Sequence, residues 1–175
     1  MNFKHLILLT TAIIFLSFGL PKNIQKKVDK EISSTFEVEE FSFVTKTISD
    51  EVAKDLPSSF GKENLFEIKV EDSLLGYAYI SKAPSKTAEF DYLVLFDNEF
   101  VVLKTKVLIY REDYGGEIGS KRWLKQFTGK GKTDEVIFGE NIVAISGATI
   151  SVRSMTNAMN NLLKSIKILH QKNII

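Results

Sequence analysis

The segment Ser146–Ser151 combines small residues with hydroxyl side chains immediately before a helical pattern. Its glycine and alanine allow a ligand to approach the backbone, and its two serines and Thr149 supply hydroxyl groups that can donate, accept or form an ester. The first N–H groups of a helix lack intrahelical acceptors, and the helix dipole favours negative charge beside them. The segment therefore predicts a binding site for a phosphate or another anion.

A long amphipathic helix is predicted directly after this segment, from Ser151 to about Gln171. Apolar residues recur there at helical spacing and form one stripe: Val152, Met155, Met159, Leu162, Ile166 and Leu169. Before the segment, the apolar run Ile142–Ile145 predicts a short buried strand. Serine and threonine also cap helices that bind no ligand, so simple capping remains an alternative to the anion site.

Several further motifs lie in a fixed order between residues 65 and 165. They are Gly76-Tyr77-Ala78, Phe96–Phe100, Glu112–Gly115, and Trp123 and Phe127 with Gly129-Lys130. Together with Ser146-Gly147-Ala148-Thr149, then Ile150, Ser151, Arg153 and a helix, this order resembles the FMN-binding domain family. That family includes the C subunit of sodium-translocating NADH:quinone reductase and the G subunit of Rnf-type electron-transport complexes.

The resemblance implies that FMN is the cofactor and that a separate flavin transferase joins its phosphate to Thr149. It also implies that the phosphate end is shaped by the neighbours of that threonine. These are Ser146, Gly147, Ala148, Ile150 and Ser151. The chain would then be an electron carrier or a subunit of a redox complex, with membrane electron-transport subunits as its redox partners.

The turn Glu112–Gly119 is expected to approach the flavin, because the matching family segment does so. Tyr114, beside Gly115, is expected either against the flavin ring, where flat aromatic contact is favourable, or on the surface as an ordinary turn residue. Arg153 is expected either to pair with the phosphate or to face solvent.

Some positions depart from the family's pattern. Glu99 stands where the family's hairpin usually has glycine, and Asp113-Tyr114 replaces the Thr-Pro of its Glu-Thr-Pro-Gly-Leu-Gly segment. Val143 replaces an aspartate that the transferase is thought to recognise, and the nearest acid is Glu140. Covalent attachment is therefore the part of the prediction that Val143 puts in question.

Composition excludes several other classes of protein. The chain of 175 residues has 44% hydrophobic and 26% charged residues, which is typical of one globular domain. The net charge of +1 gives no reason to expect a nucleic-acid partner. The absence of cysteine rules out disulfides, iron–sulfur clusters and thiol catalysis in this chain. Only His5 and His170 are present, which argues against a histidine triad or a zinc site.

The N-terminus predicts export from the cytoplasm. Lys4 and His5 precede an uncharged apolar run, Leu6–Leu20, that Pro21 closes. As a helix the run would span about 22 Å, which is short for a bilayer crossing of about 20 residues. A cleaved signal peptide and a short anchor both remain open, and both put the domain in the cell envelope on the periplasmic side.

The remaining sequence predicts an α+β fold: a single domain with an antiparallel sheet, a few helices and a long C-terminal helix. Leu65–Val70 and Leu74–Ile80 flank an acidic turn and predict one hairpin. Alternation from Phe90 to Phe96, a turn and the run Phe100–Tyr110 predict a second. One face of that last run should carry Val101, Leu103, Thr105, Val107 and Ile109.

We expect three segments along the chain. Residues 1–21 form the signal peptide or anchor, 22–60 a helical connector, and 61–175 the FMN-binding domain. In the connector, the spacing of Ile24, Val28, Ile32 and Phe36 predicts one helix, and a second should end near Pro57. The rival functional interpretations are a non-redox envelope module that uses the Ser-Gly-Ala-Thr turn as an anion site, and a structural envelope protein without a ligand.

Overall fold

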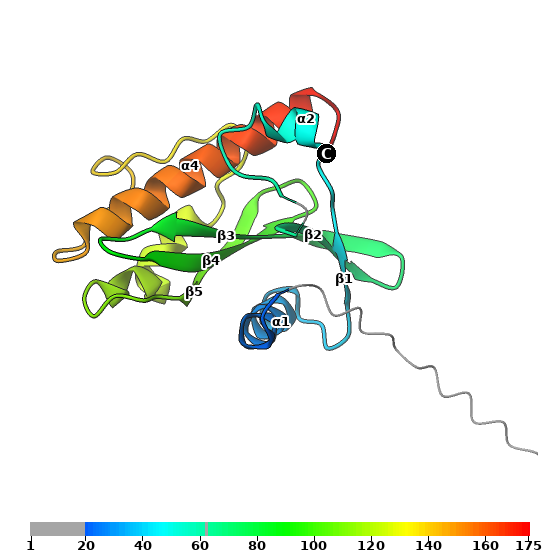
Figure 1. The fold of residues 1–175 in the computed structure, drawn as a ribbon. Coiled ribbons are helices and arrows are strands. Elements are labelled where there is room, and N and C mark those ends of the chain that lie inside the picture. The colour runs from blue at the N-terminus through cyan, green and yellow to red at the C-terminus, as the bar shows by residue number, and fades with distance from the viewer. Residues whose placement is uncertain (1–19, 62) are drawn as a thin grey trace, which may run out of the picture.

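A five-stranded antiparallel sheet, in the order β1-β2-β3-β4-β5, lies between two layers of helix (Figure 1). The computed structural model describes residues 20–61 and 63–175. The strands are β1 (Ser42–Thr45), β2 (Leu65–Val70), β3 (Ser73–Pro84), β4 (Glu89–Asp97) and β5 (Val102–Ile109). The helix α1 (Lys22–Phe36) covers one face and α4 (Thr149–Gln171) the other. The predicted α+β fold with a long C-terminal helix is confirmed.

The remaining helical segments are short. They are α2 (Asp50–Ala53), α3 (Lys121–Leu124) and the 3-10 turns η1 (Gly116–Gly119) and η2 (Lys125–Phe127). Within residues 20–61 and 63–175, none of the helices combines the length and apolar character that a bilayer crossing requires. The predicted leader falls almost entirely on residues 1–19, outside the described part of the chain.

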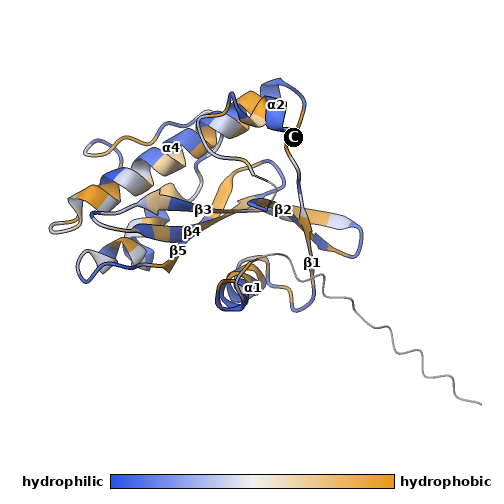
Figure 2. Cartoon of the chain, viewed as in Figure 1, coloured by the Kyte–Doolittle hydropathy of each residue, from blue (hydrophilic) through white to orange (hydrophobic). Residues whose placement is uncertain are grey.

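Two apolar layers hold the helices against the sheet. Along β3, Tyr77 and Tyr79 face the layer beneath α4, whereas Ala78 and Ile80 face the layer beneath α1. The strand β4 is buried along nearly its whole length because both of its faces are covered by helix. Figure 2 shows apolar residues, in orange, along the strands and on both covering helices.

The predicted stripe on α4 is confirmed, since each of its residues is at most 1% exposed: Val152, Met155, Met159, Leu162, Ile166 and Leu169.

The segment expected to be a connector is built into the domain. Its first helix is confirmed as α1, whose Ile24, Val28 and Ile32 are buried against the sheet. The segment also contains β1, which the sequence did not predict and which pairs antiparallel with β2. Four residues carry too little periodicity for β1 to be recognised, whereas pairing and the stacking of Phe43 on Phe66 stabilise it in the fold.

The strand β5 departs from the simple alternation predicted for it. Between the pairs Leu95↔Lys104 and Phe96↔Val102, β5 advances by one residue more than β4, which makes a β-bulge at Leu103. The bulge reverses the alternation, so Val102 is fully buried while Leu103 is 37% exposed. The predicted core positions Thr105 and Val107 are confirmed, and the prediction for Leu103 is wrong. The prediction for Ile109 is also wrong, because a second register shift between Asp91 and Tyr92 turns it to the α1 side of the sheet.

The buried strand predicted at Ile142–Ile145 is also wrong. Only Ile142 is fully buried, and it forms a single isolated bridge with Phe138. The chain turns back on itself there, with Ile142 N–H donating to Ile137 O. Val143 consequently points to solvent and is 68% exposed. An apolar run of four residues could not reveal this reversal, because its turn lies upstream at Gly139, where φ is +82°.

Gly76 is required where β3 passes α1. A Cβ at this position would overlap the carbonyl oxygen of Phe96 and come within 2.9 Å of Phe36 Cζ. We predict that Gly76→Ala lowers the free energy of unfolding by about 3 kcal/mol, because the strand must shift to relieve the overlap. Chemical denaturation of the purified domain measures this effect. Gly131→Ala is the control, since its nearest contact is at 3.7 Å, and equal losses in both variants would contradict the steric explanation.

Candidate functional site

The two segments that the sequence singled out lie in direct contact. A Cβ placed on Gly115 would come within 3.2 Å of Ala148 Cβ and 2.8 Å of Tyr110 Oη. Gly115 also has a φ of +83°, which side chains other than glycine rarely adopt. Only glycine therefore allows the turn after β5 to pack against the start of α4.

A hydrogen-bonded tyrosine joins the same two segments. Tyr110 Oη donates to the carbonyl oxygen of Tyr114 at 3.0 Å and lies 3.0 Å from Ser151 Oγ. A phenol has one proton to donate, so the Ser151 hydroxyl is the donor in the second bond. Ser151 is only 4% exposed. Its hydroxyl group therefore stabilises the start of α4 through the bond to Tyr110.

The N-terminus of α4 is open to a ligand. Thr149 is the first helical residue and is exposed, and Ala148 is the N-cap without any side-chain cap bond. The first backbone bond of the helix runs from Val152 N–H to Ala148 O, and the first turn contains no acidic residue. Gly147, with φ +80°, has open space around its Cα. Among the described residues no hydroxyl caps this helix, so the simple capping alternative is wrong here.

Three large apolar side chains stand exposed on the segments that form the site. Tyr114 is 85% exposed, Val143 68% and Ile150 52%. Val143 is held in place by its backbone, since its N–H donates to Gln126 Oε1 and its carbonyl accepts from Trp123 Nε1 at 2.8 Å. Exposed apolar groups beside an anion site are suited to contact with the apolar part of a ligand or a partner protein.

Glu112 organises the loop between β3 and β4. Its carboxylate accepts hydrogen bonds from Ser85 Oγ at 2.6 Å, from the N–H and Oγ1 of Thr87, and from Ala88 N–H. These bonds stabilise the ionised form and lower the pKa of Glu112 to about 2. The structure thus brings Gly115 to the start of α4 and engages Glu112 with the neighbouring loop; contact of Glu112 with a cofactor stays a prediction.

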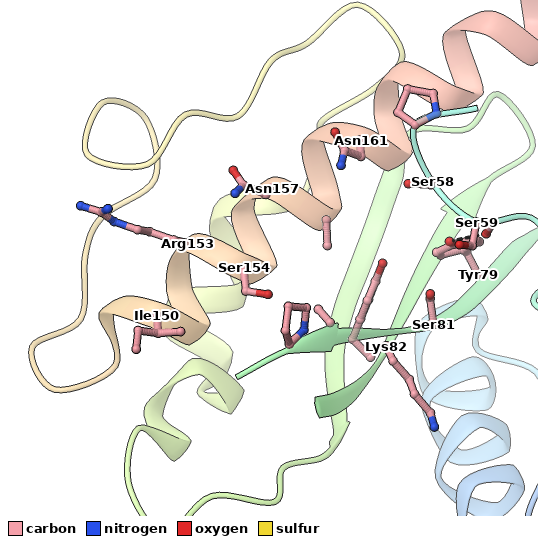
Figure 3. Close-up of a pocket in the computed structure, with 15 residues that line it drawn as sticks. Ser58, Ser59, Tyr79, Ser81, Lys82, Ile150, Arg153, Ser154, Asn157 and Asn161 are labelled. Atoms are coloured by element: carbon pink, nitrogen blue, oxygen red, sulfur yellow. Dashed lines mark hydrogen bonds between the residues drawn. The ribbon is translucent and has the colours of Figure 1, made fainter. Parts of the chain in front are cut away.

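Arg153 lies one turn into α4, near the predicted phosphate site. Its guanidinium carbon is 4.7 Å from the centre of the Phe138 ring, a cation–π contact. Figure 3 shows its side chain extending away from Ser154, which points toward β3. Pairing of Arg153 with a phosphate therefore requires it to leave Phe138 and stays a prediction.

A cavity of about 510 Å³ runs between α4 and β3, starting next to Thr149 (Figure 3). The sequence did not predict it, because its walls come from four separate stretches of the chain: residues 57–59, 79–84, 92 and 150–161. The residues that line it are Pro57, Ser58, Ser59, Tyr79, Ser81, Lys82, Ala83, Pro84, Tyr92, Ile150, Arg153, Ser154, Asn157, Ala158 and Asn161. The one available signal was the polar spacing of Ser154, Asn157 and Asn161, which an ordinary solvent-facing helix also has.

Comparison with known proteins supports an FMN-related interpretation of this geometry. Residues 87–164 match the FMN-binding domain family. The matched range contains Glu112, Gly115 and the whole Ser146–Ser151 segment, so the resemblance seen in the sequence is confirmed. No curated protein matches the chain.

The fold is also similar to a solved structure. The crystal structure of NqrC from Shewanella oneidensis aligns with a TM-score of 0.57 and 13% sequence identity, covering 86% of this chain and 98% of that one. At this identity the likeness establishes the fold. The match to the FMN-binding domain is thus the finding that bears on a ligand, and the NqrC structure adds the fold.

The bonds of Glu112 give a pH prediction. Because its pKa in the folded state is lowered to about 2 from 4.5, the stabilisation is fully present above pH 4.5 and is lost as the pH falls toward 2. We predict that Glu112→Gln lowers the melting temperature at neutral pH and flattens its fall over that acidic range. Thermal melts from pH 7 to 2 test this, with Glu117→Gln, an exposed acid in η1, as control. Parallel curves for Glu112→Gln and wild type would contradict it.

Proposed function

We propose that this chain is an extracytoplasmic electron-transfer protein that carries FMN joined through its phosphate to Thr149. The observation that carries the proposal is the exposed Thr149 at an uncapped, acid-free helix N-terminus, inside the range that matches the FMN-binding domain. Free N–H groups and the helix dipole favour a phosphate there. FMN supplies the redox chemistry, while the protein positions it and tunes its surroundings.

Attachment at Thr149 requires an enzyme from outside the chain. An unactivated hydroxyl is a poor nucleophile, and the one histidine among the described residues, His170, lies near the opposite end of α4. A flavin transferase with FAD as donor supplies the missing activation. The Thr149 oxygen then forms a bond to the FMN phosphorus, the pyrophosphate bond breaks, AMP leaves, and the hydroxyl proton ends on the leaving group.

Redox proteins of an electron-transport complex are the proposed partners. The similarity of the fold to NqrC supports this proposal, and the exposed side chains of Tyr114, Val143 and Ile150 offer apolar surface near the attachment site. The apolar run Leu6–Leu20 supports a location in the cell envelope, outside the cytoplasm, with the run acting as signal peptide or anchor.

Attachment predicts a loss of covalent flavin in Thr149→Ala. The variant should fold normally, because Thr149 is exposed and its side chain caps no helix. In-gel fluorescence of the denatured protein, made together with the transferase, should fall to background. Thr128→Ala, which removes another exposed threonine, should keep the full signal. A fluorescent band from the Thr149→Ala variant would contradict attachment at Thr149.

Placement is tested separately with a reporter. A phosphatase that is active only outside the cytoplasm, fused after Pro21, should be active, because the fusion then carries the whole leader and interrupts no element of the sheet. A matched fusion with Ile14→Lys, which puts a charge in the middle of the apolar run, should lose activity. High activity of the charged fusion, or none in the parent, would contradict the proposed location.

A further inference from the structure

Three exposed lysines form a row along the outer side of α1. Lys22, Lys26 and Lys30 are spaced by four residues, and side chains at this spacing lie on the same side of a helix. We call these three residues the lysine face. The residues that α1 buries against the sheet lie on the opposite side of the helix: Ile24, Val28 and Ile32. The lysine face therefore points away from the domain.

The other charged residues of α1 are engaged within the domain. Glu31 forms ion pairs with two lysines of β5, at 2.6 and 3.5 Å. Lys27 Nζ donates to the carbonyl oxygen of Leu108 at 2.6 Å, and Asp29 accepts from Gln25 Nε2 at the same distance. The lysine face, by contrast, forms no ion pair with any acid in residues 20–61 and 63–175. Its charge is thus available to something outside the domain.

The lysine face does not stabilise the helix that carries it. Like charges four residues apart on a helix repel each other, which applies to Lys22 with Lys26 and to Lys26 with Lys30. Lys22 is also the first residue of α1, where the helix dipole disfavours a positive charge, and the first turn contains no acid. The row is therefore better explained by attraction to a negatively charged surface than by the stability of α1.

The place of the lysine face in the chain favours a membrane as that surface. The apolar run Leu6–Leu20 ends two positions before Lys22. Anionic phospholipid headgroups attract lysines that follow a membrane segment, and the attraction falls off within a Debye length of about 10 Å. An upright α1 would carry Lys30 about 12 Å further from the bilayer than Lys22, at 1.5 Å per residue. Only a helix that lies along the surface keeps all three lysines within reach of the headgroups.

The rest of the domain agrees with this orientation. Three exposed acids follow the last turn of α1, so the positive charge is confined to the part of the helix next to the apolar run: Glu37, Glu39 and Glu40. The helices α1 and α4 cover opposite faces of the sheet (Figure 1). A domain that rests on α1 thus keeps α4, with Thr149 at its start, on the side away from the membrane, where partner proteins can reach it.

We propose that the lysine face of α1 docks onto anionic phospholipid headgroups, so that α1 lies along the membrane surface and α4 faces away from it. This inference rests on the location given under the proposed function, with the apolar run retained as an anchor. It adds the orientation of the domain, which an anchor alone does not determine.

The test measures how close α1 lies to the headgroups in the full chain. Cell-free synthesis in the presence of vesicles retains the apolar run, and the chain has no cysteine, so one introduced cysteine carries one fluorophore. Ser34→Cys labels an exposed position near the far end of α1, and Asn157→Cys labels α4. The vesicles contain phosphatidylcholine with or without phosphatidylglycerol, and some of the lipid carries a headgroup quencher. Phosphatidylglycerol should increase quenching at Ser34 several-fold and leave the weak quenching at Asn157 unchanged.

Charge-neutral variants show whether the lysine face causes the effect. Lys22→Gln, Lys26→Gln and Lys30→Gln together should reduce quenching at Ser34 to the level seen in phosphatidylcholine alone. This triple variant should fold, because the change relieves repulsion within α1. The matched control makes the same change of charge at exposed lysines of α2 and α4 and should keep the full effect: Lys54→Gln, Lys164→Gln and Lys167→Gln.

The outcomes separate docking from the proposed function. Equal quenching at Ser34 in the two kinds of vesicle overturns docking and leaves the domain tethered by the apolar run alone. Quenching that persists in the triple variant of the lysine face overturns docking by these residues. The readout contains no flavin, so a chain that docks but carries no covalent flavin in the denatured gel overturns the FMN proposal alone.

Discussion

The close contact between Gly115 and Ala148 is the constraint on which the site depends. It brings the turn after β5 to the start of α4, and the Tyr110–Ser151 hydrogen bond fixes that arrangement. Because Ser151 is consumed by this bond, the exposed hydroxyl at the helix start is that of Thr149. Ser151 is thereby bound to Tyr110 while Thr149 stays exposed, and the helix N-terminus has no side-chain cap.

The sheet makes this arrangement rigid. Apolar side chains of α4 and α1 cover its two faces, so β3 and β4 are buried on both sides and cannot shift without exposing core. The loop between these strands is held from outside by Glu112, whose low pKa reflects four hydrogen bonds. Core packing therefore fixes the wall of the cavity that β3 forms. The hydrogen bonds of Glu112 fix the loop that follows Pro84, at the end of that wall.

Local patterns predicted the parts of the fold that local physics determines. The stripe from Val152 to Leu169 and the hairpins β2–β3 and β4–β5 were predicted correctly, because helical spacing and turn chemistry operate over a few residues. The bulge at Leu103 and the reversal before Val143 were not, because each depends on a partner segment. Within the candidate site, the order of the motifs along the sequence was enough to single out Thr149 and Gly115. The contact between Gly115 and Ala148 could be seen only in the structure.

The cavity could not be predicted from the sequence for a related reason. Ser58, Tyr92 and Asn157 are ordinary in their local contexts and become a common wall only when the chain folds. The exposure of Val143 is similar: its apolar run predicted burial, yet its side chain lies in solvent and only its backbone is bound. The position where the family usually has a carboxylate is therefore exposed in this chain, although its side chain is apolar.

The most direct measurement of the central claim is the visible absorption spectrum of the protein purified from its own host, before and after acid precipitation. Covalent attachment predicts flavin absorbance that stays with the precipitated protein, since a phosphoester at Thr149 survives unfolding. Flavin released into the supernatant would contradict covalent attachment and indicate reversible binding. A protein without flavin absorbance in either fraction would contradict the FMN-carrying function itself.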